Sequence, residues 1–127
     1  MDQYHRPHTK KVNSGTGGRR RKFRDKKTSQ LGGSFAATKV ANNDIKTYVR
    51  GRGGSYGVKL KKAPKINVVT KDGKVKMVQI KRVIESHNPE FVRMNIITRG
   101  AVLETELGKV KVTNRVGQDG VVNGVVI

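Results

Sequence analysis

The second half of the chain alternates hydrophobic and polar residues at a spacing that predicts short β-strands. Two such runs, residues 66–70 and 75–84, flank the sequence Lys-Asp-Gly-Lys. An Asp-Gly pair between two hydrophobic runs is typical of a tight hairpin turn, because both residues tolerate the backbone angles that the turn requires. In the second run one face, interrupted by Arg82, is expected to carry Val78, Ile80 and Ile84. These residues predict a β-hairpin.

A second hairpin is predicted over residues 101–112. Its first strand alternates glutamates with small or apolar residues, which are Ala101, Leu103, Thr105 and Leu107. Gly108 turns the chain into a second strand, where two valines alternate with two lysines. This alternation predicts one buried and one solvent-facing side. Glu104 and Glu106 could form a catalytic carboxylate pair, but cross-strand pairing with Lys109 and Lys111 explains them better.

Turn-forming residues predict where the other strands begin and end. Asn88 and Pro89 mark a loop. The sequence Gly-Gln-Asp-Gly at 117–120 predicts a turn, which leads into an apolar strand over residues 121–127. Asn123-Gly124 could instead form a tight turn, although only three residues follow it in the sequence.

These segments predict an all-β fold with a small antiparallel β-barrel body over residues 41–127. The last 65 residues contain 14 Val and 6 Ile, which favour strand over helix. Closure is favoured because a few short strands otherwise leave exposed edges. A core built from so few residues is marginal, so we expect residues 45–50 and 58–60 to add strands to it.

Positive charge is concentrated in the first half of the chain. Residues 1–62 carry 17 Lys and Arg against 3 acids, whereas residues 63–127 carry 11 against 6. The net charge of +19 opposes compaction unless a polyanion neutralises it. Residues 1–40 hold no segment able to form a core, so they predict a long, basic, non-globular N-terminal extension. We expect it to order on binding RNA.

The extension holds the densest cationic cluster, with seven Lys or Arg among residues 19–27. Arginine binds phosphate in bidentate fashion and stacks on bases, and Phe23 adds an aromatic face. A solvated tail or a localisation signal is the alternative interpretation. The RNA-binding residues predicted for the extension are Lys10, Lys11, Arg19, Arg20, Arg21, Lys22, Phe23, Arg24, Lys26 and Lys27.

A second basic segment, residues 50–62, combines cations with glycines. Glycine lets backbone N–H groups approach phosphates closely, and Tyr56 either stacks on a base or closes the turn. The spacing fits no mononucleotide-binding pattern, and a plain flexible turn is the alternative. The RNA-binding residues predicted here are Arg50, Arg52, Gly53, Gly54, Tyr56, Lys59, Lys61 and Lys62. Candidates for a second contact surface on the body, with a solvated face as the alternative, are Arg82, Arg99 and Arg115.

The composition argues against several classes of function. With no Cys the chain has no disulfide, thiol nucleophile or thiolate metal site. His5 and His8 make a poor zinc set, because Asp2 is the only carboxylate near them. No nucleophile, base and orienting group occur together, so we expect no metal, no cofactor, no small-molecule substrate and no catalysis. No stretch is apolar enough for a signal peptide or a membrane span, which predicts a soluble intracellular protein.

The C-terminal residues resemble a known family. Residues 95–127, NIITRGAVLETELGKVKVTNRVGQDGVVNGVVI, are similar to the archaeal and eukaryotic small-subunit ribosomal protein family eight-e. The most specific segments are VTNR at 112–115 and GQDGVVN at 117–123, although Val116 stands where members usually have Pro. The compact length is similar to that of archaeal members. The similarity extends upstream, over nearly the whole chain, through residues 93–100, 50–63 and 15–27.

The resemblance implies a β-barrel with a basic extension threaded into small-subunit ribosomal RNA, without cofactor or turnover. The implied partners are small-subunit rRNA and neighbouring small-subunit ribosomal proteins, and the implied location is the small subunit in the cytoplasm. Most contacts are expected to phosphate and sugar. With roughly ten phosphates the log–log salt slope is expected to be about −7 to −9. The alternatives are an assembly factor of related fold and a DNA-architectural protein, which usually shows minor-groove wedges or a recognition helix.

Overall fold

The computed structural model describes residues 3–4, 15 and 31–127, and the chain divides into two units. The first unit is Met1–Phe35. Its described strands are β1 (Gln3–Tyr4) and β2 (Leu31–Gly32), which pair antiparallel. The second unit, Ala36–Ile127, contains every other described strand. The predicted non-globular extension falls mostly on residues outside the described ranges.

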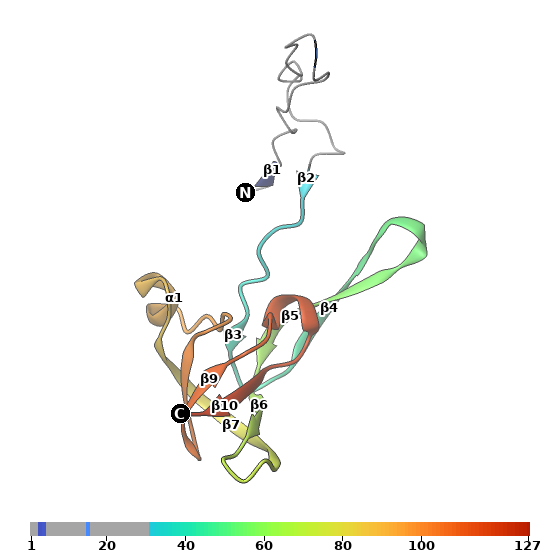
Figure 1. The fold of residues 1–127 in the computed structure, drawn as a ribbon. Coiled ribbons are helices and arrows are strands. Elements are labelled where there is room, and N and C mark those ends of the chain that lie inside the picture. The colour runs from blue at the N-terminus through green and yellow to red at the C-terminus, as the bar shows by residue number, and fades with distance from the viewer. Residues whose placement is uncertain (1–2, 5–14, 16–30) are drawn as a thin grey trace. The chain divides into compact units, whose positions relative to one another are not determined.

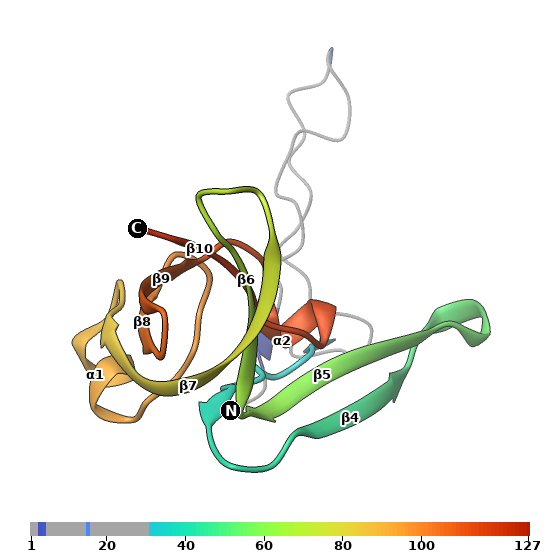
Figure 2. The same cartoon turned by 90° about the horizontal axis from the view of Figure 1, so that it is seen from below.

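The second unit is built around a closed barrel of five strands, which Figure 2 shows from one end. Around the barrel the order is β10 (Asn123–Val126), β6 (Lys65–Val69), β7 (Val75–Glu85), β8 (Val102–Thr105) and β9 (Gly108–Val112). Both predicted hairpins are present, β6 with β7 and β8 with β9. Gly73 turns the first with φ 76° and Gly108 the second with φ 108°. The all-β class and the small barrel are thus confirmed.

The barrel is not antiparallel throughout, which corrects the prediction. Neighbouring strands are antiparallel from β6 to β10, but β10 closes the barrel against β6 in parallel. When an odd number of strands alternate in direction around a closed barrel, one pair of neighbouring strands must be parallel. Gly124 permits the close fit of β10, because a Cβ there would stand 2.6 Å from Val110 Cγ1 and 2.8 Å from the Lys111 carbonyl oxygen.

Alternation along the strands fills the barrel with aliphatic side chains. At least 99% of the surface is buried in Ile66, Val68, Leu103, Val110 and Val112. Leu60 and Ala63 from β5 (Tyr56–Ala63) join this core, as expected for residues 58–60, whereas every residue of β4 (Ile45–Arg50) is exposed. Leu107 is also exposed, because it lies in the β8–β9 turn rather than on the strand.

A β-bulge in β7 reverses the predicted alternation beyond Ile80, whereas Val78 and Ile80 are buried as predicted. The register of β7 against β8 shifts between Ile80 and Arg82, and an extra residue of this kind changes which side chains face inward. Val83 therefore enters the core in place of Ile84, and Arg82 faces solvent. The expectation that Arg82 interrupts an apolar face was wrong.

Two short helices stand where loops were predicted. Asn88 caps α1 (Pro89–Arg93), since its side-chain oxygen accepts a hydrogen bond from the Glu90 N–H at 3.0 Å. Proline at the first helical position suits that cap, because its nitrogen needs no acceptor. The predicted 117–120 turn is α2 (Val116–Asp119), ended by Gly120 at φ 72°. Asn123 and Gly124 lie in β10, so they do not form a tight turn.

A second sheet of three strands adjoins the barrel. β5 lies in its middle, parallel to β3 (Lys39–Val40) and antiparallel to β4. The 3-10 turn η2 (Arg52–Gly54) connects β4 to β5. Figure 1 and Figure 2 both show β4 and β5 as a long hairpin that extends away from the barrel. Among the described residues, no helix has the length and apolar character needed to cross a membrane.

Candidate nucleic-acid interface

The β4–β5 hairpin carries most of the predicted RNA-binding residues that the structure describes. Its turn closes through Gly51, whose N–H donates to the Ser55 carbonyl oxygen at 2.6 Å. Gly53 and Gly54 follow with φ of 74° and 79°, and a Cβ on either would have no atom within 4 Å. Backbone that is open in this way lets a phosphate or a base approach its N–H groups.

Strand register places two tyrosines and an arginine on one face of the hairpin. Tyr48 lies opposite Val58, and Arg50 lies opposite Tyr56. Because alternate residues of a strand point to the same side, these four residues share what we call the hairpin face. The side chains of Tyr48 and Tyr56 are 69% and 70% exposed. Aromatic rings carry a large apolar surface, so two exposed rings on one face indicate a binding surface.

The root of the hairpin is fixed to the barrel. The buried Thr38 hydroxyl donates to the Leu60 carbonyl oxygen at 2.7 Å. α2 packs against β5, where a Cβ on Gly120 would stand only 2.8 Å from Val58 Cγ1. Further out, every described side chain from residue 47 to 57 is exposed. The barrel therefore positions the hairpin, while the outer half presents its described side chains to solvent.

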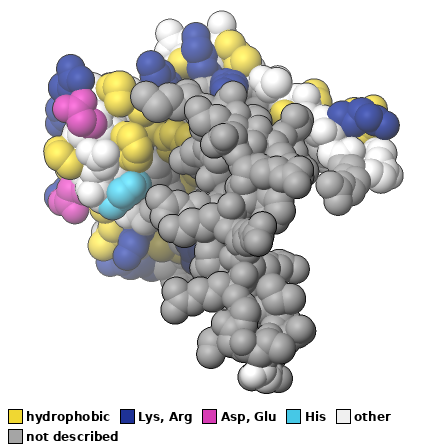
Figure 3. Space-filling model, turned by 90° about the horizontal axis from the view of Figure 1, so that it is seen from above, with side chains coloured by type: hydrophobic (Ala, Val, Ile, Leu, Met, Phe, Trp, Pro, Cys, Tyr) yellow, Lys and Arg dark blue, Asp and Glu magenta, His cyan; other side chains and the backbone are white. Residues whose placement is uncertain are grey.

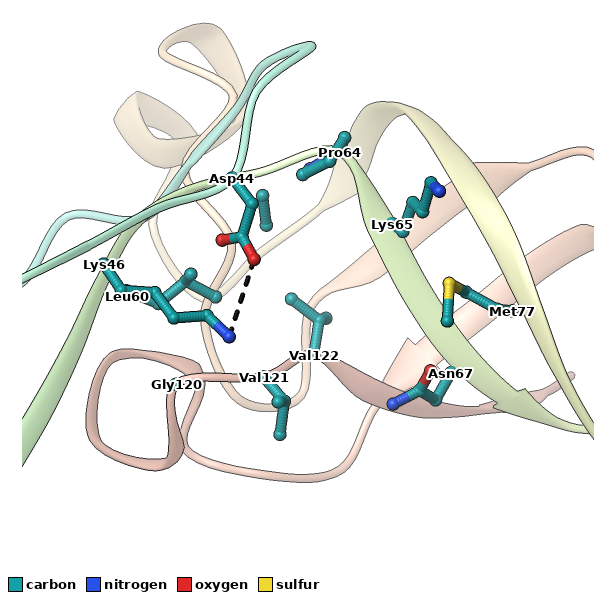
Figure 4. Close-up of a pocket in the computed structure, with 11 residues that line it drawn as sticks. Asp44, Lys46, Leu60, Pro64, Lys65, Asn67, Met77, Gly120, Val121 and Val122 are labelled. Atoms are coloured by element: carbon teal, nitrogen blue, oxygen red, sulfur yellow. Dashed lines mark ion pairs between the residues drawn. The ribbon is translucent and has the colours of Figure 1, made fainter.

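A groove of about 330 Å³ opens at the hairpin root (Figure 4). Lys46 lines it and forms an ion pair with Asp44, with 3.5 Å between Nζ and Oδ2. Lys46 lies opposite Leu60 in the strand register, on the same side as the hairpin face. The groove thus continues that face toward the barrel. Its apolar lining includes Leu60, Pro64, Met77, Val121 and Val122.

The hairpin has no acidic residue of its own. Residues 45–63 include six Lys or Arg and no Asp or Glu. Lys59 and Lys61 are half-buried along β5 and Lys62 is exposed, whereas the side chain of Arg52 lies outside the described part. Figure 3 shows a cationic patch at the outer end of the hairpin. This excess of positive charge favours an anionic partner.

The three arginines predicted on the body lie on separate elements. Arg82 forms an ion pair across β7 and β8 with Glu104, with 2.6 Å between Nε and Oε2. The prediction that Glu104 and Glu106 pair with Lys109 and Lys111 is therefore wrong in its partners. Lys109 lies opposite Glu104 in the register, but the ion pair of Glu104 is with Arg82. Lys111 lies opposite Val102, and Glu106 lies in the turn. Arg99 lies in the turn before β8, and Arg115 at the start of α2; both are exposed.

The remaining predicted residues lie outside the described ranges. They are Lys10, Lys11, Arg19, Arg20, Arg21, Lys22, Phe23, Arg24, Lys26 and Lys27. His5 and His8 lie there as well. Within the described chain, no group of three or more His, Asp or Glu is placed to hold a metal ion. His87 packs edge-on against Phe91, with 5.2 Å between ring centroids.

Sequence reasoning did not single out Tyr48, which the register places on the hairpin face. The residue lies in a segment predicted as a strand, but its role depends on which residue stands opposite. The available signal was its spacing of two from Arg50, which places both side chains on one side of a strand. Without the register, nothing linked Tyr48 to Tyr56 across the hairpin.

Comparisons with known proteins cover both the barrel and the hairpin. The family model described as Ribosomal protein S8e matches residues 7–127. A relative from Hyperthermus butylicus, named small ribosomal subunit protein eS8, is 41% identical over 100% of this chain and 93% of its own. Relatives of the same name from Methanocorpusculum labreanum and Nanoarchaeum equitans are 42% and 44% identical; the matches cover 93% and 82% of this chain, and 95% and 83% of theirs. A family of ribosomal structural proteins is not one of enzymes, so this chain is not an enzyme. The chain belongs to the ribosomal protein S8e family.

Proposed function

We propose that this protein is a structural constituent of the small ribosomal subunit, where it binds and stabilises small-subunit rRNA. The family match over residues 7–127 carries the proposal, because relatives at 41–44% identity are named as small-subunit proteins. The expected partners are small-subunit rRNA and neighbouring small-subunit ribosomal proteins, within the cytoplasmic subunit. The strongly basic composition supports the same partner class.

The proposed mechanism divides the work between a rigid body and basic projections. The barrel fixes the hairpin root, and the exposed outer half enters the space between packed RNA helices. There Arg50, Arg52 and the lysines of β5 neutralise phosphates, while Gly53 and Gly54 allow close approach of the backbone. RNA helices held side by side repel one another, so cations between them stabilise the packed arrangement.

The basic extension and the body arginines supply further contacts in this proposal. The second unit begins beside α2, since a Cβ on Gly117 would stand 3.1 Å from the Ala36 Cβ. Arg115 lies at the start of the same helix. The residues of 10–27 named above would add further contacts to the RNA. Arg82 and Arg99 would add contacts elsewhere on the barrel.

Fractionation of native ribosomes tests the proposal. A lysate is separated on a sucrose gradient with and without a high-salt wash, and the protein is quantified against small-subunit rRNA. We expect about one copy per mature small subunit, retained through the wash because many charge contacts must break together. Presence in precursor particles alone would make the protein an assembly factor, and absence from all ribosomal fractions would overturn the proposal.

Salt-dependent binding provides a second test on the isolated protein. With roughly ten phosphate contacts, the slope of log K against log salt is expected to be about −7 to −9. A slope shallower than about −3 would contradict the mechanism. Competition with duplex DNA of matched length separates the RNA-binding function from a DNA-architectural one.

A further inference from the structure

The hairpin face combines features that phosphate binding alone does not require. Tyr48 and Tyr56 expose more than two thirds of their surface and lie diagonally across the two strands. Diagonal neighbours on one face of an antiparallel pair are close enough for aromatic side chains to act together. Arg50, directly opposite Tyr56, adds a planar guanidinium that also stacks on rings.

Neither tyrosine is needed to hold the hairpin on the barrel. Both lie outside the core, while the root is held by the Thr38 hydrogen bond and by the packing of Val58 against Gly120. Exposed aromatic rings are unfavourable in water and are informative where they gather. The two rings are therefore better explained by what they bind than by what they stabilise.

The surrounding charge indicates RNA rather than protein as the partner of this face. The hairpin has six cations and no acid over residues 45–63, and its tip presents open glycine backbone. By contrast, the exposed apolar side chains of the barrel, such as Val75 and Met77 on β7, are aliphatic. Aromatic rings among cations suit nucleobases, since every base has a π-face and is carried by a phosphate chain.

We propose that Tyr48 and Tyr56, with Arg50, form a stacking platform for unpaired nucleobases of RNA. The inference rests on the proposed rRNA-binding function and deepens it by naming the ligand class. Bases within an A-form helix are stacked on their neighbours, and the deep major groove does not admit side chains. The platform therefore takes bases from a loop, bulge or single-stranded segment. Arg50 binds the adjoining phosphate or extends the stack.

The test separates stacking from charge. The full-length protein is titrated with a single-stranded RNA oligonucleotide carrying 2-aminopurine, and with a duplex of the same length, over a series of salt concentrations. Affinity extrapolated to 1 M salt largely removes the contribution of the basic extension, because counterion release then contributes little. The wild type is compared with Tyr48→Leu, Tyr56→Leu, Tyr48→Phe and Tyr56→Phe. The control variant is Val75→Ala, which changes an exposed apolar residue on the barrel.

Each Tyr→Leu change is expected to weaken single-strand binding about tenfold in the 1 M extrapolation, with the salt slope unchanged. The Phe variants keep the ring and should bind within about twofold of wild type, as should Val75→Ala. Quenching of 2-aminopurine should be lost in the Leu variants, and duplex binding should hardly change. Circular dichroism confirms that each variant is folded.

Leu variants that bind RNA and quench 2-aminopurine like the wild type would overturn the platform. Phe variants that bind RNA as weakly as the Leu variants would overturn it as well. If the Leu variants bind RNA normally but incorporate poorly into small subunits, the tyrosines contact a protein and the proposal is wrong. Failure of the wild type to bind RNA with a steep salt slope would instead contradict the proposed function itself.

Discussion

The barrel and the β4–β5 hairpin both contain antiparallel strand pairs, but their side chains serve different purposes. In the barrel, alternate side chains point into a closed interior, where Leu103 and Val110 are completely buried. In the hairpin both faces of the outer half are open, and two tyrosines lie exposed among cations. The barrel obtains its stability from burial within the chain. The described contacts hold the hairpin at its root, so the proposed RNA partner explains the exposed tyrosines better than the fold does.

The largest effect on stability is expected from a cavity in the barrel. Leu103→Ala removes a fully buried side chain and should lower the free energy of unfolding by about 2–5 kcal/mol. Chemical denaturation measures this loss. Val75→Ala, at an exposed position of β7, is the matched control and should cost less than about 0.5 kcal/mol. Similar losses in the two variants would contradict the packed core.

The contact between α2 and the hairpin root predicts a smaller loss. Gly120→Ala suffers both from the positive φ of 72° and from the approach to Val58 Cγ1 at 2.8 Å. Gly73→Ala suffers only from its φ of 76°, since open space surrounds it. We expect a loss of about 1 kcal/mol for Gly73→Ala from the left-handed backbone, and about 1–3 kcal/mol more for Gly120→Ala from overpacking. Equal losses would show that the hairpin root is not tightly packed.

Shortening the hairpin should affect binding far more than folding. Replacing residues 49–57 by Asn-Gly, a sequence suited to a two-residue turn, removes no buried side chain among those described. The free energy of unfolding should fall by less than about 1 kcal/mol. Loss of Arg50 and Arg52 should make the salt slope of rRNA binding shallower by about 1.5. An unfolded product would mean that the hairpin stabilises the barrel.

The smallest effect on stability is expected at the Arg82–Glu104 ion pair. Both side chains are partly exposed, at 69% and 36%, so Arg82→Gln should cost no more than about 0.5 kcal/mol, and less in high salt. If Arg82 contacts RNA, changes to the two residues of the ion pair should have opposite effects on RNA binding. Arg82→Gln should weaken it, whereas Glu104→Gln should strengthen it. Equal affinity of the two variants for RNA would show that Arg82 does not contact RNA.

Much of the barrel could be predicted because its signals are local. The Asp-Gly turn before β7 and the alternation around Leu103 and Val110 predict the two hairpins without knowledge of the rest. The cap of α1 was also available, since Asn followed by Pro and Glu is a helix start. The interpretation as a loop gave too much weight to proline as a breaker.

The features that could not be predicted depend on contacts between distant residues. The bulge between Ile80 and Arg82 arises from the fit of β7 to β8, and β7 alone gives no sign of it. In the candidate site, the cations and glycines of the hairpin could be recognised from the amino-acid sequence. The platform was not, because it exists only once Arg50 is set opposite Tyr56.

The parallel pairing of β6 with β10 has a consequence for the synthesis of the protein. The pair joins residues 56 positions apart, such as Asn67, which donates from Nδ2 to Asn123 Oδ1 at 3.1 Å. Chains elongate at roughly 5–20 residues per second, so β6 is complete several seconds before β10 exists. During that time the edge of β6 that β10 will cover is open to pairing with another chain. When β10 pairs with β6, it therefore covers this edge and ends the period in which the newly made chain is exposed to aggregation.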